Sequence, residues 1–289
     1  MTSIAQLLKD ARDKPFGESW HVDTELLLME AMACSRVTLL TWPEREVESS
    51  VIERFHSLLQ RRREGEPVAY LVGRREFWDF ELRVSPAVLI PRPETELLVE
   101  LAIERAISRG GKQRIVDLGT GSGAIAIAIA RENSQFHVTG VDVSSDALAM
   151  ARDNAAHLAG ENLDFIEGSW LEDRVCAAIA GHEGEARCVD ILVSNPPYIA
   201  PADPHLLQGD LRWEPPLALS CANAGMEAIR QIICTSHRVL KSGAWILFEH
   251  GYGQREAVAK ALLQAGFDTV ECYRDLAGND RVTSARFSR

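Results

Sequence analysis

The segment Asn195-Pro196-Pro197-Tyr198 combines side chains and backbone groups that can hold a planar amino group. Proline fixes φ and has no N–H donor, so two prolines make a rigid wall whose carbonyl oxygens are free to accept hydrogen bonds. Asn195 adds a side-chain oxygen acceptor, and Tyr198 adds a flat face for stacking. Such a loop can turn the nitrogen of an –NH2 group toward an electrophile. In isolation, the same residues also suit a proline-rich turn capped by asparagine.

A glycine-rich loop, residues 119–123 (Gly-Thr-Gly-Ser-Gly), offers a second kind of binding chemistry. It joins an expected strand to an expected helix. Glycines let the backbone turn tightly and let a ligand lie against it. The spacing is Gly-x-Gly-x-Gly, in which the third glycine comes one residue earlier than in dinucleotide-binding loops. The shorter loop fits S-adenosylmethionine, which carries no phosphate groups.

Asp142 stands 19 residues after Gly123 and ends the next hydrophobic stretch. A carboxylate at that place can accept hydrogen bonds from both hydroxyl groups of a ribose. Alone, the glycine loop could be a tight turn and Asp142 a solvated side chain. Loop, strand and aspartate in this order favour the binding function.

The elements that must position these residues alternate between helix and strand from Thr95 onward. This alternation predicts an α/β fold with a doubly wound, mostly parallel sheet, whose ligand crevice lies beyond the carboxyl ends of the strands. The glycine loop and residues 195–198 should face that same crevice. Two further strands near the end predict an antiparallel hairpin. We expect helices at Leu97–Ile107, from Ala124 and at Asp146–Leu158, and strands at Arg114–Leu118, His137–Val143, Leu163–Glu167, Val189–Ser194, Ala244–Glu249, Asp268–Arg274 and Val282–Phe287.

Residues 1–75 show helical periods and predict a small bundle of amphipathic helices. Residues 76–93 predict a hairpin-like linker, in which Phe77–Val84 alternates with period two, Ser85-Pro86 turns, and Val88–Ile90 continues. The expected apolar stripes of the bundle are Ile4, Leu7, Leu8 and Ala11 on the first helix, Val22, Leu26, Met29 and Ala33 on the second, and Val51, Ile52, Phe55, Leu58 and Leu59 on the third.

Composition excludes several classes of protein. Of 289 residues, 46% are apolar and 25% are charged, and the net charge is −11. This acidity disfavours sequence-independent binding along a phosphate backbone, which needs clustered Lys and Arg. The six cysteines form no Cys-x-x-Cys pair, so neither zinc nor a redox dithiol is expected. With no signal-peptide pattern, and a longest apolar run (Ala124–Ala130) too short to cross a bilayer, we expect a cytoplasmic protein without a membrane partner.

Residues 117–123, Asp142 and residues 195–198 together resemble the amino-group branch of class I S-adenosylmethionine-dependent methyltransferases. Nearly the whole chain is similar to the HemK/PrmC family, the glutamine N5-methyltransferases of peptide chain release factors. The resemblance implies a helical substrate-docking domain over residues 1–75, a hairpin linker over 76–93 and a catalytic domain over 94–289. The other matching segments are Glu66–Gly73, Leu89–Glu96, Glu249–Gln254 and Asp275–Val282.

The resemblance also implies the reactants and the site residues. S-adenosylmethionine would give its methyl group to the glutamine of the Gly-Gly-Gln tripeptide in class I release factors. No metal and no direct nucleic-acid contact are expected, and a monomer is expected. Catalytic roles fall on Asn195, Pro196 and Tyr198, and contacts to the glutamine on Asn195, Pro196, Pro197 and Tyr198. The methyl donor would be held by Gly119, Thr120, Gly121, Ser122, Gly123, Asp142, Trp170 and Asn195.

The chemical hypothesis is an in-line displacement in which positioning makes the main contribution. Asn195 and the Pro196 carbonyl would accept the two amide hydrogens and stabilise positive charge growing on the nitrogen. The methylated amide is then acidic enough to lose a proton to water, so no dedicated base is required.

Three other functions fit part of the pattern. The same loop would serve an adenine N6 or guanine N2 amine, but a nucleic-acid methyltransferase should show a basic groove. A close relative modifies a ribosomal protein glutamine instead, although Ile199–Leu219 resembles the release-factor branch better. A non-catalytic binding protein would have no need of an intact Asn195–Tyr198 segment.

Some neighbouring residues carry weaker expectations. Residues 174–188 look longer than is usual in the family and are interpreted as a surface elaboration, and no site residue is placed in Leu219–Gly225. For Glu249 and His250, at a strand end, a structural hydrogen bond is favoured over catalysis. Three residues could close over the cofactor, although the last of them could equally start a helix: Arg92, Glu94 and Thr95.

Overall fold

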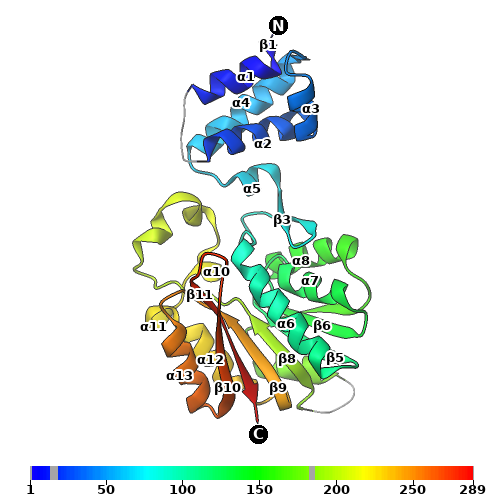
Figure 1. The fold of residues 1–289 in the computed structure, drawn as a ribbon, viewed down its shortest axis with the longest axis vertical. Helices are drawn as coiled ribbons and strands as arrows, with labels where there is room; N and C mark the ends of the chain where they lie inside the picture. Colours follow the sequence, from blue (N-terminus) through cyan, green and yellow to red (C-terminus); the bar gives the residue numbers. More distant parts are fainter. Residues whose placement is uncertain (1, 14–18, 182–185, 289) are drawn as a thin grey trace. The chain divides into compact units, whose positions relative to one another are not determined.

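The computed structural model describes residues 2–13, 19–181 and 186–288 (Figure 1). Contacts divide the chain into two compact units, Met1–Arg74 and Arg75–Arg289. Each unit has its own buried apolar residues. Within the described ranges, no helix is both long and apolar enough to span a membrane.

The first unit is a small helical bundle, as its sequence periods predict. Its core contains Ile4, Leu7 and Ala11 of the first helix and Phe55, Leu58 and Leu59 of the fourth. Ser3 caps the first helix by accepting a hydrogen bond from the Gln6 N–H at 3.2 Å. The elements are β1 (Thr2–Ser3), α1 (Ile4–Arg12), α2 (Trp20–Met32), α3 (Arg36–Thr41), β2 (Glu46–Val47), α4 (Ser49–Arg63) and α5 (Val68–Val72).

The prediction of which face of α2 is buried is wrong. Val22 and Leu26 are 58% and 38% exposed, and Ala33 ends the helix in a left-handed conformation. The buried face instead carries Leu27, Leu28 and Ala31, together with Asp23, which pairs with Arg62 of α4 at 2.7 Å. Because three leucines follow one another at residues 26–28, periodicity alone could not choose between two adjacent faces.

The hairpin before the second domain also turns earlier than predicted. Strands β3 (Arg74–Phe77) and β4 (Phe80–Arg83) form a two-stranded sheet, and Trp78 in the turn has a φ of 57°. The segment Val88–Ile90 forms no strand. The alternating run Phe77–Val84 therefore contains the turn instead of one continuous strand, since only two residues separate β3 from β4.

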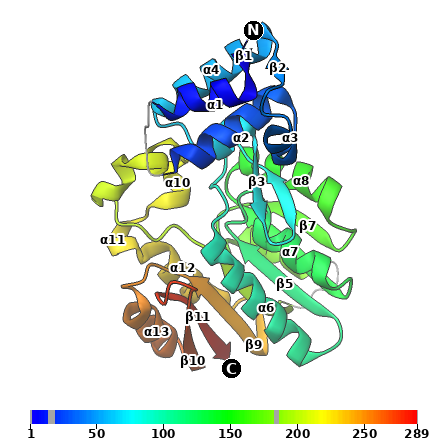
Figure 2. The ribbon, with the colours of Figure 1, turned by 45° about the horizontal axis from the view of Figure 1, so that its top comes forward.

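The second unit is an α/β fold around a seven-stranded sheet, which confirms the predicted fold class (Figures 1 and 2). The strand order is β10-β11-β9-β8-β5-β6-β7. Five of these strands run parallel: β5 (Gln113–Leu118), β6 (Phe136–Asp142), β7 (Leu163–Glu167), β8 (Val189–Ser194) and β9 (Leu240–Glu249). The chain winds from β5 outward through β6 and β7, then returns to β8 on the other side of β5.

Helices cover both faces of this sheet, and alternate strand residues enter separate cores. Ile191 and Val193 of β8 lie in the core beneath α6 (Glu96–Arg109) and α7 (Ala124–Glu132), while Leu192 lies in the opposite core. The other helices are α8 (Ser145–Leu158), α9 (Asp173–Ala180), α10 (Pro216–Leu219), α11 (Ala222–Gly225), α12 (Glu227–Ser236) and α13 (Arg255–Gln264), with short 3-10 turns η1 (Pro93–Thr95), η3 (Pro204–Leu207) and η4 (Gly209–Trp213).

The predicted hairpin near the end of the chain is present, with one strand placed inside the sheet. Strand β11 (Asp280–Phe287) pairs antiparallel with both β9 and β10 (Phe267–Arg274). The pairing register shifts between Asp268 and Glu271, where Thr269 has a φ of 48°. Because β11 runs against β9, its first residues lie at the same edge of the sheet as the carboxyl end of β9.

The segment 174–188 belongs partly to the core. Val175 and Ile179 of α9 and Cys188 are buried against one face of the sheet. Residues 182–185 lie outside the described residues. The interpretation of the whole segment as a surface elaboration is therefore wrong for its helical part.

Candidate active site

The carboxyl ends of four of the five parallel strands bring the predicted site residues to one edge of the sheet. The glycine loop follows β5, Asp142 ends β6, Trp170 follows β7, and Asn195 follows β8. Strands β5 and β8 are neighbours where the winding direction reverses, which is the usual place for a ligand crevice in such sheets. A hydrogen bond of 2.7 Å from the Ser194 hydroxyl to the Leu118 carbonyl joins the two strand ends.

Asp142 holds the glycine loop in place. One of its carboxylate oxygens accepts from the backbone N–H of Gly121 and the other from that of Ser144, both at 2.9 Å. Gly121 has a φ of 55°, and a Cβ there would meet no atom within 4 Å. The backbone at this glycine is therefore open on the side where a side chain would stand, and a ligand can approach it.

Asp117, the residue before Leu118 in β5, was not placed in the site by sequence reasoning. It is fully buried, and its Oδ2 accepts a hydrogen bond of 2.7 Å from the Thr120 hydroxyl. Within the described residues its Oδ1 has no hydrogen-bond partner. Burial, with a smaller contribution from the nearby Asp142 charge, raises the pKa of Asp117 to about 7. A buried acceptor without a donor indicates a place for a cationic or hydrogen-bonding ligand group.

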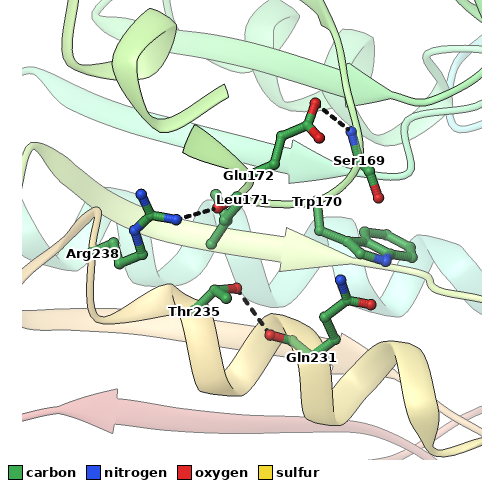
Figure 3. A pocket seen from close by; sticks show the side chains of 7 residues that line it. All are labelled: Ser169, Trp170, Leu171, Glu172, Gln231, Thr235 and Arg238. Atoms are coloured by element: carbon green, nitrogen blue, oxygen red, sulfur yellow. Dashed lines mark hydrogen bonds between the residues drawn. The ribbon is translucent and has the colours of Figure 1, made fainter. Parts of the chain in front are cut away.

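Trp170, the aromatic residue that the resemblance assigns to the methyl donor, comes shortly after β7. A Cβ built on Gly119 would lie 3.4 Å from the indole ring, so the ring packs directly on the glycine loop. Figure 3 shows Trp170 beside Gln231 of α12 at one end of a cavity of about 170 Å³, with Arg238 at the other end. Arg238 is already engaged there, because it donates to the Leu171 carbonyl at 3.0 Å and pairs with Asp173 at 2.6 Å.

Two of the backbone carbonyls of residues 195–198 already have hydrogen-bond donors. The carbonyl of Pro197 accepts from the Cys221 thiol at 3.0 Å, and that of Tyr198 accepts from Gln254 Nε2 at 2.9 Å. Throughout the chain that the structure describes, no donor reaches the Pro196 carbonyl or Asn195 Oδ1. The two acceptors that the chemical hypothesis requires are therefore among those left open.

A buried carboxylate links the loop to two other elements. Glu249, at the end of β9 and 1% exposed, accepts from the Thr95 hydroxyl at 2.7 Å and from the Tyr198 hydroxyl at 3.1 Å. The same Thr95 oxygen accepts from Asn195 Nδ2 at 3.2 Å. Burial raises the pKa of Glu249, against the lowering effect of these hydrogen bonds and of the Arg281 charge. Burial, followed by the charge of Glu249, likewise raises the pKa of Tyr198.

The neighbouring residues with weaker expectations serve structural contacts. His250 is fully buried and bonds Thr283 Oγ1 at 2.8 Å and the Gly251 carbonyl at 3.0 Å, and burial lowers its pKa. Arg92 pairs with the buried Glu214, whose other oxygen accepts from the Ile90 N–H at 3.0 Å. Helix α6 begins right after Thr95, but the Thr95 hydroxyl does not cap it.

Gly225 is a second residue that sequence reasoning missed, because no site residue was placed in 219–225. It has a φ of 79°, and a Cβ there would lie 1.9 Å from the Tyr198 carbonyl oxygen. Only glycine therefore lets this segment pass so close behind the loop. Gln254 connects the same two segments, since its Nε2 donates to the carbonyls of both Tyr198 and Ala224.

Comparisons with known proteins agree with this geometry. A family model for the PrmC N-terminal domain matches residues 2–73, and one for a methyltransferase domain matches residues 110–278. A protein of Pseudomonas aeruginosa named release factor glutamine methyltransferase is 44% identical, with 100% of each chain covered. One of the same name from Vibrio cholerae is 43% identical over 98% of this chain and 93% of its own.

Among solved structures, a methyltransferase from Pyrococcus furiosus is similar with a TM-score of 0.52. It is 14% identical and covers 72% of this chain and 89% of its own. At that identity the likeness concerns the fold alone.

Proposed function

The chain belongs to the release factor glutamine methyltransferase family, and on that premise we propose that it transfers a methyl group to the side-chain amide nitrogen of a release-factor glutamine. The substrate is the glutamine of the Gly-Gly-Gln tripeptide in class I release factors, and the methyl donor is S-adenosylmethionine. The observation that carries this proposal is the pair of open acceptors, Asn195 Oδ1 and the Pro196 carbonyl, in a loop whose Pro197 and Tyr198 carbonyls are occupied. A primary amide has two hydrogens to match them.

The residues at the edge of the sheet fit S-adenosylmethionine. The open backbone at Gly121 and the acceptor Asp117 Oδ1 suit a ligand with an ammonium group, and the carboxylate of Asp142 suits a ribose. Two buried or half-buried carboxylates beside a glycine loop would repel a phosphate but attract a cation. Trp170 borders the place for the adenine, by its packing on Gly119. When bound, this cofactor supplies an electrophilic methyl group on sulfur.

The chain's own residues then position the weak nucleophile. A carboxamide nitrogen reacts poorly because its lone pair is delocalised, so orientation must supply much of the rate, and fixed orientation can contribute roughly 7–11 kcal/mol. Asn195 Oδ1 and the Pro196 carbonyl accept the two amide hydrogens and leave the nitrogen facing the methyl group. As the nitrogen gains positive charge, the two acceptors stabilise it more strongly than they stabilise the neutral amide. Tyr198, fixed through its hydroxyl, offers its ring as a wall for the glutamine side chain.

The experiment that tests the proposal is mass spectrometry of a purified class I release factor incubated with the protein and S-adenosylmethionine. Parallel reactions contain DNA, RNA or a ribosomal protein. We expect one added methyl group on the Gly-Gly-Gln glutamine. Label entering nucleic acid or the ribosomal protein instead would keep the fold and the methyl donor but overturn the substrate.

The charge on Asp117 should have opposite effects on two properties: it should strengthen cofactor binding and lower folding stability. The folded-state pKa of about 7 lies above the ordinary value of 3.8. Stability contributed by the neutral acid is therefore complete below about pH 4 and is lost as pH rises toward 7. In Asp117→Asn this loss is absent, so the ligand-free variant should gain roughly 2–4 kcal/mol of unfolding free energy at pH 8.

The same variant should bind S-adenosylmethionine about 10–100-fold more weakly at pH 8, because it lacks the charge that pairs with the ammonium group. Denaturant unfolding and calorimetric titration at pH 5 and pH 8 measure both effects. An Asp117→Asn protein with wild-type affinity and an unchanged stability profile would contradict this role.

The first unit is proposed to dock the release factor. Three apolar side chains on and just after α3 are exposed: Val37 by 68%, Leu40 by 66% and Trp42 by 52%. Replacing all three with serine should raise KM for the intact release factor by about tenfold or more, since buried apolar anchors dominate interface energies. KM for a short Gly-Gly-Gln peptide should stay unchanged. Equal effects on the factor and on the peptide would contradict docking by this unit.

A further inference from the structure

The loop that holds the substrate amide is itself held by a chain of hydrogen bonds with a fixed direction. Asn195 Nδ2 lies 3.2 Å from Thr95 Oγ1, and Thr95 Oγ1 lies 2.7 Å from Glu249 Oε2. On its other side, Glu249 Oε1 lies 3.1 Å from the Tyr198 hydroxyl. One carboxylate therefore reaches both ends of the segment 195–198 through two hydroxyl groups.

The charge of Glu249 sets the direction of this chain. Both oxygens of Glu249 accept here, one from each hydroxyl group, and in its charged form Glu249 has no proton to give in return. The Thr95 hydroxyl then has its proton directed at Glu249 and can offer Asn195 only a lone pair. Asn195 must therefore turn its –NH2 group to Thr95, and its Oδ1 is left on the opposite side, without a partner among the described residues.

Two opposing influences act on the charge of Glu249: burial raises its pKa, whereas the two hydroxyl donors and the charge of Arg281 lower it. Arg281 lies near enough for its guanidinium to stabilise negative charge on Glu249 and Tyr198. It is fixed by Asp275 Oδ2 at 3.1 Å and by the His250 carbonyl at 3.3 Å. Glu249 is 1% exposed and Thr95 is 4% exposed, so water does not compete for either group. Thr95 and Glu249 are 154 residues apart in the sequence, and their contact joins the start of α6 to the end of β9.

We propose that Thr95 and Glu249 are positioning residues that set the orientation of the Asn195 amide, so that its oxygen, and not its nitrogen, meets the substrate amide. This inference rests on the proposed function, in which Asn195 Oδ1 accepts an amide hydrogen. If the oxygen and nitrogen of the Asn195 amide exchanged places, its –NH2 group would face the substrate –NH2 group, and two hydrogen-bond donors would meet. Neither Thr95 nor Glu249 needs to touch the substrate for this effect.

The test compares two substitutions at Thr95 that differ in one hydroxyl group. Thr95→Val keeps the shape and removes the hydroxyl, and Thr95→Ser keeps the hydroxyl and removes a methyl group. We expect kcat for a Gly-Gly-Gln peptide to fall about 10–100-fold in Thr95→Val, with KM changed less than threefold. Thr95→Ser should stay within about threefold of wild type in both constants.

A measurement without turnover separates orientation from stability. In protein labelled with ¹⁵N-asparagine, the side-chain amide signals of Asn195, assigned by their loss in Asn195→Ala, should shift in Thr95→Val and remain in place in Thr95→Ser. Glu249→Gln should shift them as well, because its amide can donate to Thr95 and reverse the chain. Thermal unfolding and calorimetric affinity for S-adenosylmethionine show whether each variant is folded.

Equal losses of kcat in Thr95→Val and Thr95→Ser, or wild-type kcat in Thr95→Val, would overturn the inference. Asn195→Ala in the same assay keeps this outcome separate from the proposed function. If Asn195→Ala loses turnover while Thr95→Val does not, the proposed function stands and only the positioning role fails. If Asn195→Ala retains turnover, the proposed mechanism itself fails.

Discussion

Asn195→Ala is expected to lower turnover by roughly 10²–10³-fold, the usual loss when one preorganised contact to a developing charge is removed. The substitution removes an open acceptor, Asn195 Oδ1, and leaves the Pro196 carbonyl to hold the substrate amide alone. It also removes the donor to the Thr95 hydroxyl, which then keeps its bond to Glu249. Single-turnover kinetics with saturating S-adenosylmethionine and a Gly-Gly-Gln peptide measure the loss.

The fold of this variant should be unaffected. Asn195 is half-buried and lies in a loop whose backbone is held independently through Pro197 and Tyr198. Its melting temperature should therefore stay close to that of the wild type. Asn195→Ala with near-normal turnover would mean that the amide is held by other groups, and the mechanism would be wrong.

Gly225→Ala is expected to have an effect as large, by a different route. A Cβ at this position would lie 1.9 Å from the Tyr198 carbonyl oxygen and 2.5 Å from its carbonyl carbon, and both are backbone atoms. Since φ at Gly225 is 79°, alanine is also strained in that conformation. The segment 195–198 must shift, and a displacement of about 1 Å can cost on the order of 10²-fold in rate. The measurement is kcat for the peptide substrate.

Gly253→Ala is the matched control for this prediction. It follows β9 at the same edge of the sheet, and a Cβ there would meet no atom within 4 Å. The control should keep kcat within about twofold of the wild type and Gly225→Ala should not. Similar activities for the two alanine variants would show that the loop tolerates the displacement.

Alternation of helices and strands was sufficient to predict the α/β sheet and to bring the loops after β5, β6, β7 and β8 to one edge. This success has a simple cause: each parallel strand must be followed by a crossover, so all carboxyl ends meet at that edge. Local periodicity was less informative where apolar residues are consecutive, as in Leu26–Leu28 of α2. It also failed at Trp78, because a turn of two residues inside an alternating run leaves the alternation intact.

The supporting residues of the site could not be predicted from spacing. Asp117 belongs to the motif 117–123, but its spacing does not show that its buried Oδ1 lacks a donor within the described structure. Gly225 is one glycine among 20, and only its approach to Tyr198 distinguishes it. The contact of Thr95 with Glu249 joins residues 154 positions apart. A side-chain hydrogen bond between residues so far apart leaves no periodic pattern in the sequence. Only a three-dimensional structure can show it.

The position of β11 inside the sheet has a consequence for synthesis on the ribosome. Strand β10 is made before β11, yet among the described strands it pairs with β11 alone, which separates it from β9. Until residues 280–287 have emerged, β9 exposes an unpaired edge and β10 has no partner in the sheet. Unpaired edges of this kind invite pairing with other chains. We therefore expect the nascent protein to be prone to aggregation until β11 inserts between β9 and β10.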